Sequence, residues 1–184
     1  MDAQTTLFML SATVRLAVAV IFALAAVQSL RNAAEFTGIV EQYHIAPRWL
    51  VSAAARLLPP LELAAAAALL VPVTSHAGGV LGLCLTTLFT GAIAVNLARG
   101  RTFIDCGCGG ASGQRLSGGL VLRNLTLMAG LVMVVVAPPT GPVDGWTAIS
   151  VTGASLTLIV TYFAANQLMT NRQTLSQLRS GRSR

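Results

Sequence analysis

Charged side chains are scarce in this chain of 184 residues: they make up 10% of it, whereas hydrophobic residues make up 54%. A soluble domain carries about 25% charged residues, so the composition excludes an ordinary soluble protein. Lysine is absent, because all 12 basic residues are arginine, and aromatic residues are only 5%. The net charge of +6 is therefore not accompanied by an aromatic-rich basic face of the kind that binds nucleic acid. We expect no nucleic-acid partner.

The sequence also lacks a polar stretch long enough for a soluble domain. Five apolar segments reach the roughly 20 residues needed to cross a bilayer, at about 7–30, 49–71, 77–98, 118–137 and 146–169. Because helices satisfy their own backbone groups in lipid, we expect an all-α integral membrane protein that forms one membrane domain over residues 1–184. The first segment is too long for a signal-peptide core and lacks a basic leader, so we expect it to be retained. Between and after these spans we place an amphipathic helix at about 31–46, a cysteine loop at 99–117 and a basic tail at 170–184.

An amphipathic helix is predicted at about residues 31–46. Its apolar residues Phe36, Ile39, Val40 and Tyr43 follow i, i+3, i+4, i+7 spacing, which places them on one helical face. Such a helix lies along a membrane interface. We interpret it as a cap on the helical bundle, with docking of a substrate as the alternative.

Arginine is distributed asymmetrically along the chain. It flanks the connection between the first and second spans, the connection between the third and fourth spans, and the tail, whereas the opposite flanks hold only Asp2, His76 and Asp144. The positive-inside bias predicts a periplasmic N-terminus and a cytoplasmic C-terminus in a bacterial inner membrane. It places the cysteine loop on the cytoplasmic side.

Two charged residues fall inside the predicted spans. Arg15 lies in the first span, and Glu62 lies in the second, just after a predicted helix break at Pro59-Pro60. Adjacent spans run antiparallel, so both charges are expected about 12–13 Å below the same surface. A charge at that depth is costly unless it is paired, which predicts a buried ion pair between Arg15 and Glu62. Proton handling or quinone contact by Glu62 is the alternative.

Only three cysteines are present, and two of them, Cys106 and Cys108, are separated by one glycine. A pair so close can form a strained disulfide when glycine supplies backbone freedom, and strained, exposed disulfides tend to be exchangeable. Zinc binding is the alternative to a disulfide, but a structural zinc site needs four protein ligands. Cys84 lies about 20 Å away by helical rise, and His44 and His76 are expected at opposite sides of the membrane. We expect no metal site, and we expect Cys84 to be a small buried hydrophobe.

Five polar residues flank the cysteine pair in the sequence: Asp105 directly precedes it, and Asn96, Arg101, Arg123 and Asn124 lie near the two span ends. A nearby arginine stabilises the reactive thiolate and a carboxylate opposes it. Arg101, Arg115 and Arg123 are therefore candidate stabilisers of a thiolate. Helix capping is the alternative role for the two asparagines.

Across about two-thirds of its length the chain resembles the MauE family of methylamine-utilisation membrane proteins, a branch of the DoxX-like group. The most specific block is Asn96–Arg101 followed by Asp105–Gly109. Gly110 departs from the expected aromatic-glycine pair after the second cysteine. Weaker matches are Arg15, 36–47, 60–63, 69–70, Arg123 and Asn124.

The resemblance implies a DoxX-like four-helix core. The segment 146–169 carries Tyr162, Asn166 and Gln167 but no charge, so we expect it to pack peripherally. It further implies an accessory protein for maturation of the methylamine dehydrogenase small subunit, acting beside a thioredoxin-like partner similar to MauD. Cys106 and Cys108 would exchange thiols and disulfides, and a quinone is a candidate cofactor. The alternatives are a non-catalytic assembly or export factor, and a DoxX-like thiol or quinone electron carrier in another pathway. A role in periplasmic disulfide chemistry would place the loop outside, against the arginine asymmetry.

Overall fold

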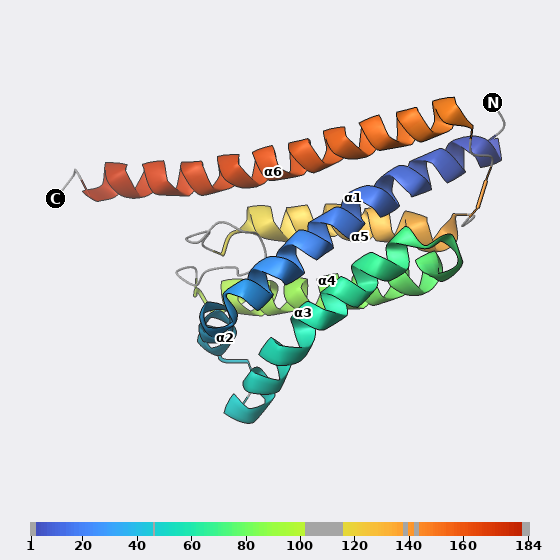
Figure 1. Cartoon of the computed structure of the whole chain (residues 1–184). Helices are drawn as coiled ribbons and strands as arrows, with labels where there is room; N and C mark the ends of the chain where they lie inside the picture. The colour runs from blue at the N-terminus through green and yellow to red at the C-terminus, as the bar shows by residue number, and fades with distance from the viewer. Residues whose placement is uncertain (1–2, 46, 102–115, 138–139, 142–143, 182–184) are drawn as a thin grey trace.

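The computed structural model describes residues 3–45, 47–101, 116–137, 140–141 and 144–181 (Figure 1). This part of the chain contains six α-helices, one short 3₁₀ turn and no strand, so the prediction of an all-α protein is confirmed. The helices are α1 (Ala3–Arg31), α2 (Ala33–Gln42), α3 (Arg48–Leu70), α4 (Ser75–Ala98), α5 (Gly118–Val136) and α6 (Gly145–Gly181), with the turn η1 (Pro72–Thr74) between α3 and α4.

Five of the described helices, all except α2, are long and apolar enough to cross a membrane. The first four agree with the predicted spans to within a few residues. Helix α6 is the exception, because it continues to Gly181 through the segment that we expected to be a tail. Residues 170–180 contain neither glycine nor proline, so nothing in the backbone chemistry ends the helix sooner. The predicted interfacial helix is present but shorter, as α2.

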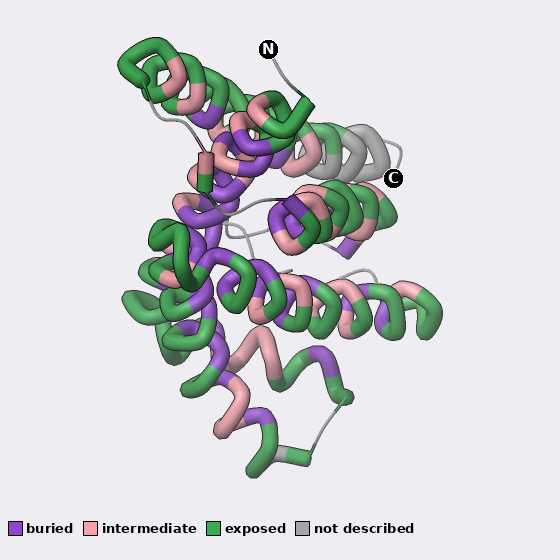
Figure 2. The backbone as a smooth tube through the Cα atoms, turned by 90° about the vertical axis from the view of Figure 1, so that its right-hand side faces the viewer, coloured by how far each residue is buried: buried purple, intermediate pink, exposed green. Residues whose placement is uncertain are grey.

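Helices α1, α3, α4 and α5 pack around a common core. Helix α1 contacts α3 and α5, and α4 contacts the same two helices. The centre is filled by buried apolar side chains, among them Ala19, Phe22, Leu69, Leu85 and Leu131. Figure 2 shows that buried residues concentrate where these helices face one another.

Helix α6 lies outside this core and packs along α1. Only 6% of its most apolar stretch is buried against the rest of the protein, which agrees with the predicted peripheral position. A polar contact joins the two helices, because Ser155 Oγ donates a hydrogen bond to the carbonyl oxygen of Thr13 at 3.0 Å.

Glycines in α4 bring its backbone close to its neighbours. A Cβ atom at Gly78 would lie 2.7 Å from the backbone nitrogen of Leu69, and one at Gly82 would lie 3.1 Å from side-chain atoms of Phe22 and Leu131. Small residues at helix contacts let membrane helices approach closely. The first half of α4 therefore packs tightly against the end of α3.

Helix α3 continues through Pro59 and Pro60, so the predicted helix break is wrong. Proline removes one intrahelical hydrogen bond, but the surrounding helices hold the segment helical.

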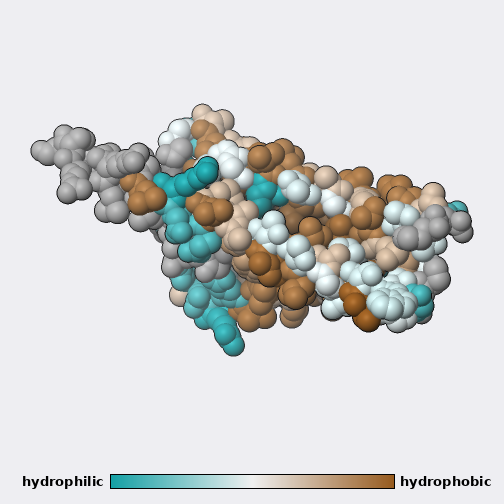
Figure 3. Space-filling model, turned by 90° about the horizontal axis from the view of Figure 1, so that it is seen from above, coloured by the Kyte–Doolittle hydropathy of each residue, from teal (hydrophilic) through white to brown (hydrophobic). Residues whose placement is uncertain are grey.

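The polar residues of the protein gather towards one end of the surface seen in Figure 3, and apolar residues cover most of the middle. This distribution is typical of a protein that spans a membrane.

Candidate functional site

The predicted redox centre lies in the connection between α4 and α5. Cys106, Cys108 and Asp105 are outside the described residues, so the redox centre that they form stays a prediction. The described chain stops at Arg101 after α4 and resumes at Leu116 before α5. We call this end of the bundle the cysteine-loop end.

Arg123 is the best-anchored of the predicted supporting residues. It lies in the second turn of α5, and its side chain reaches across to α6. Its Nη1 donates a hydrogen bond to Oδ1 of Asn166 at 2.9 Å, while Nε and Nη2 donate to Oδ1 of Asn124 at 3.2 and 3.1 Å. The guanidinium carbon lies 5.6 Å from the centre of the Tyr162 ring, within the range of a cation–π contact. The structure thus brings together Arg123 and Asn124, two of the predicted residues.

Asn166 and Tyr162 complete this cluster, although the sequence interpretation gave them no role beyond peripheral packing. Asn166 is buried, with 3% of its surface exposed. The two residues are four positions apart, which places them on the same side of α6. Polar residues at helical spacing in an otherwise apolar span were the available indication. The partner on α5 was not apparent from the sequence.

Asn96 lies in the last turn of α4 and is fully buried. Its Nδ2 donates to the carbonyl oxygen of Ala92 at 3.0 Å, while its buried Oδ1 accepts no hydrogen bond from the residues that the structure describes. The backbone N–H of Arg101 donates to the Asn96 carbonyl oxygen at 3.0 Å, and this bond closes the end of the helix. Arg101 itself is exposed. Asn96 Oδ1 is therefore an acceptor beneath the cysteine-loop end for which the described part of the chain supplies no donor.

The two predicted intramembrane charges are both buried: Arg15 is 8% exposed and Glu62 is 7% exposed. Nε of Arg15 donates to the carbonyl oxygen of Leu69 at 3.1 Å, so the guanidinium contacts the C-terminal end of α3. Glu62 lies seven residues earlier, on the same side of that helix. The ion pair between Arg15 and Glu62 stays a prediction.

Cys84 is exposed on α4, so the prediction that it is buried is wrong. Its neighbours Gly82 and Leu85 face the protein interior, and the helical turn directs Cys84 away from it. A thiol behaves as a small hydrophobe and can remain on a lipid-facing surface.

His76 lies at the opposite end from the cysteine loop, where its Nε2 and the carbonyl oxygen of Ala137 are 3.2 Å apart in a hydrogen bond.

The fold and its apolar helices define a multi-pass helical membrane protein with a polar cluster at one end. The family described as "Methylamine utilisation protein MauE" matches residues 7–137. The chain is 41% identical over 157 residues to the methylamine utilization protein MauE of Methylorubrum extorquens, and the match covers 83% of each chain. It is 40% identical over 156 residues to that of Methylophilus methylotrophus, covering 83% of this chain and 82% of the relative.

A third relative, the methylamine utilization protein MauE of Paracoccus denitrificans, is 34% identical over 175 residues, covering 91% of this chain and 92% of the relative. No solved structure gives a significant match. The chain belongs to the MauE family, and this membership links it to methylamine utilisation.

Proposed function

We propose that this protein carries out thiol–disulfide exchange through Cys106 and Cys108 during maturation of the methylamine dehydrogenase small subunit. The observation that carries the proposal is the cysteine pair itself, separated by one glycine and included in the segment that matches the family. The small subunit as client, and a MauD-like thioredoxin partner, rest on the family resemblance.

The exchange reaction balances within the two proteins. A thiolate of one partner attacks the disulfide of the other and forms a mixed disulfide, with the second sulfur released as a thiolate. The remaining thiol of the attacking protein then resolves the mixed disulfide. One dithiol is oxidised and one disulfide is reduced, with two electrons and two protons transferred. A MauD-like protein or a membrane quinone would accept or supply this pair in the next cycle.

Arg101 and Arg123 support the proposal through their charge, because a cation lowers the pKa of a nearby thiol, whereas Asp105 acts in the opposite sense. Asn96 and Asn124 would position the loop. Glu62 is the candidate for proton handling between the loop and the membrane interior.

A non-catalytic assembly or export factor is the second candidate function. The observation in its favour is that Arg123 binds Asn124 and Asn166, a role that stabilises the bundle without any thiol chemistry. In that function the cysteine pair would brace the loop, and the bundle would anchor a partner.

Single Cys106→Ser and Cys108→Ser variants test the proposal, with Cys84→Ser as the matched control. We expect each loop variant to abolish maturation of the small subunit at normal membrane abundance, and one of them to accumulate a mixed disulfide that mass spectrometry identifies. Cys84→Ser should behave as the wild type. Full maturation with both loop variants would reject thiol exchange and favour the assembly factor.

The side of the membrane is a separate proposal: we place the cysteine loop in the cytoplasm on the arginine asymmetry. In a Cys84→Ser background, a membrane-impermeant maleimide applied to intact cells after mild reduction should leave Cys106 and Cys108 unlabelled until the cells are broken. Prompt labelling of intact cells would place the loop in the periplasm.

A further inference from the structure

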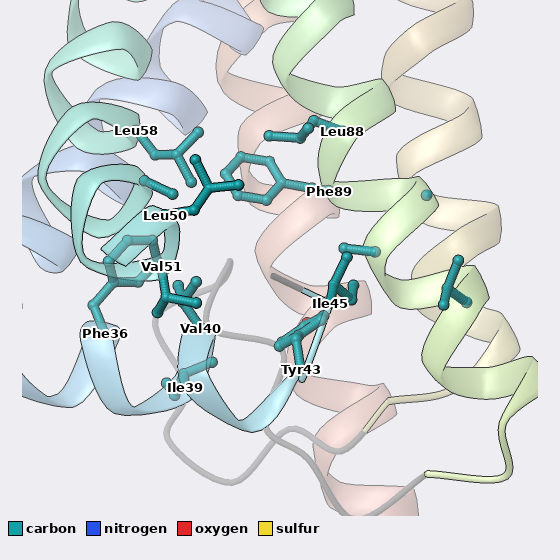
Figure 4. Close-up of a pocket in the computed structure, with 14 residues that line it drawn as sticks. Phe36, Ile39, Val40, Tyr43, Ile45, Leu50, Val51, Leu58, Leu88 and Phe89 are labelled. Atoms are coloured by element: carbon teal, nitrogen blue, oxygen red, sulfur yellow. The ribbon is translucent and has the colours of Figure 1, made fainter. Parts of the chain in front are cut away.

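An apolar groove lies between α2, α3 and α4, at the cysteine-loop end of the bundle. It has a volume of about 550 Å³, within the range of sites that hold small molecules. The predicted apolar face of α2, including Phe36, Ile39 and Val40, forms one wall, and Leu58 and Leu88 from the other two helices project into the same space (Figure 4). The side chains that line the groove are almost entirely hydrocarbon.

The backbone keeps this groove open. All the α3 residues that line the groove precede Pro59. The part of α3 that packs tightly against Gly78 of α4 is at Leu69, after Pro59. Gly91 of α4 lines the groove, and a Cβ atom placed there would meet no atom within 4 Å. The groove is therefore a feature of how the three helices diverge, and a side chain at position 91 would enter it.

Arg99 stands at the end of the groove. Ala92 and Val95 line its α4 wall, and Arg99 follows Val95 by four residues, so it continues the same helical side by one turn. Nη1 of Arg99 donates to the carbonyl oxygen of His44 at 3.3 Å. His44 adopts a positive φ of 47°, and its neighbours Tyr43 and Ile45 both line the groove.

The charge at this end suits an anion. The hydrogen bond to His44 uses one of the five N–H donors of the guanidinium, and Arg99 is exposed. Arg101 adds a second exposed positive charge two residues later, while the carboxylates of Glu35 and Glu41 on α2 partly offset it. Arginine binds phosphate in a bidentate manner, and basic sites at helix ends bind the headgroups of anionic lipids.

We propose that the groove holds an acyl chain of an anionic phospholipid whose phosphate binds Arg99. The apolar walls receive the chain within the hydrocarbon region, and Arg99 marks the depth at which the phosphate begins. This site is independent of the thiol chemistry proposed for Cys106 and Cys108.

The test uses the full chain in nanodiscs of equimolar phosphatidylglycerol and phosphatidylcholine, followed by mild detergent extraction and mass spectrometry of the retained lipids. The wild type should retain phosphatidylglycerol preferentially. Arg99→Gln should lower that preference about fivefold, because Arg99 binds the phosphate in the proposed site and one arginine at a lipid headgroup contributes about that factor. Arg172→Gln, which removes the same charge from the exposed side of α6, should leave it unchanged.

Gly91→Phe should displace the bound lipid by filling the groove. Its control is Gly153→Phe on α6, where a new Cβ atom also meets nothing within 4 Å. Equal lipid selectivity in the wild type, Arg99→Gln and Gly91→Phe would overturn the proposal. In protein extracted directly from the bacterial membrane, loss of a neutral isoprenoid quinone from Gly91→Phe but not from Arg99→Gln would also overturn it, because that pattern would assign the groove to a quinone tail.

Discussion

Arg123 of α5 and Asn166 of α6 are joined by a hydrogen bond of 2.9 Å from Nη1 to Oδ1. This contact links the peripheral helix to the core at the cysteine-loop end, whereas Ser155 and Thr13 link α6 to α1 further towards the other end. Arg123, which we predicted to support a thiolate, thus also holds α5 and α6 together.

Replacing Asn166 by alanine should loosen α6. A hydrogen bond to a charged group contributes about 1.5–3 kcal/mol, and its loss leaves Arg123 with one acceptor fewer in a partly buried setting. We expect a lower midpoint of thermal unfolding in detergent. Asn171→Ala, at an exposed position of the same helix, is the control, and identical midpoints for the two variants would contradict this role.

Replacing Asn96 by leucine should maintain or raise stability. The buried Oδ1 accepts no hydrogen bond within the described part of the chain, and such an orphaned group costs about 1–3 kcal/mol. Membrane abundance measured by quantitative immunoblotting should therefore not fall. If abundance falls, Oδ1 is satisfied in the folded protein. If abundance holds while maturation of the client is lost, Asn96 serves the cysteine loop.

Glu62→Gln should reduce membrane abundance if Arg15 and Glu62 form the predicted ion pair. Removing one member leaves an uncompensated buried charge, which costs about 3–5 kcal/mol. Asp144→Asn is the matched carboxylate-to-amide control, because Asn caps a helix about as well as Asp. Equal abundance of the two variants would argue against the pair.

Gly78→Leu should destabilise the contact between α3 and α4. The new Cβ atom would lie 2.7 Å from a backbone nitrogen and 2.9 Å from a backbone carbon, and overpacking of this kind costs about 1–3 kcal/mol. Thermal unfolding in detergent should show the loss. Gly153→Leu, which enters open space, should unfold no earlier than the wild type, and equal midpoints for the two variants would mean that the helices separate easily.

Asp144 provides a pH-dependent cap for α6. Hydrogen bonds from the Thr147 side chain and then from its backbone N–H lower the pKa of the Asp144 carboxyl, and the backbone bond is 2.9 Å long. Because the folded-state pKa is depressed, this stabilisation is present above the ordinary carboxyl pKa and is lost as the pH falls through the lower value. Thr147→Val should raise the pKa towards the ordinary range in an NMR titration of the labelled carboxyl. An unchanged pKa would assign the shift to the backbone.

The helices were predictable because their causes are local. Apolar length defined the spans, and the spacing of Phe36, Ile39, Val40 and Tyr43 indicated the apolar face of α2. Those four residues line the groove. The extent of α6 was missed because the hydrophobic pattern ends before the helix does.

The contacts between helices were harder to predict, since they depend on how far each helix is rotated and displaced. Asn166 was visible as a polar residue in an apolar span, but its pairing with Arg123 joins residues 43 positions apart. The groove was not predictable from spacing either, because it arises where α3 diverges from α4. Cys84 shows the same limit: a lone thiol in a span has no pattern that distinguishes an inward from an outward position.

The length of α6 has a mechanical consequence. Its 37 residues correspond to about 55 Å of helix, whereas the hydrocarbon core is about 30 Å thick and the whole bilayer about 45 Å. Figure 1 shows this helix projecting well past the other helices at the cysteine-loop end. Because α6 is continuous and longer than the bilayer is thick, its last turns would extend into the water beyond the headgroups, at a fixed distance from the membrane surface. A soluble protein that grips those turns would be held at that height above the cysteine-loop end.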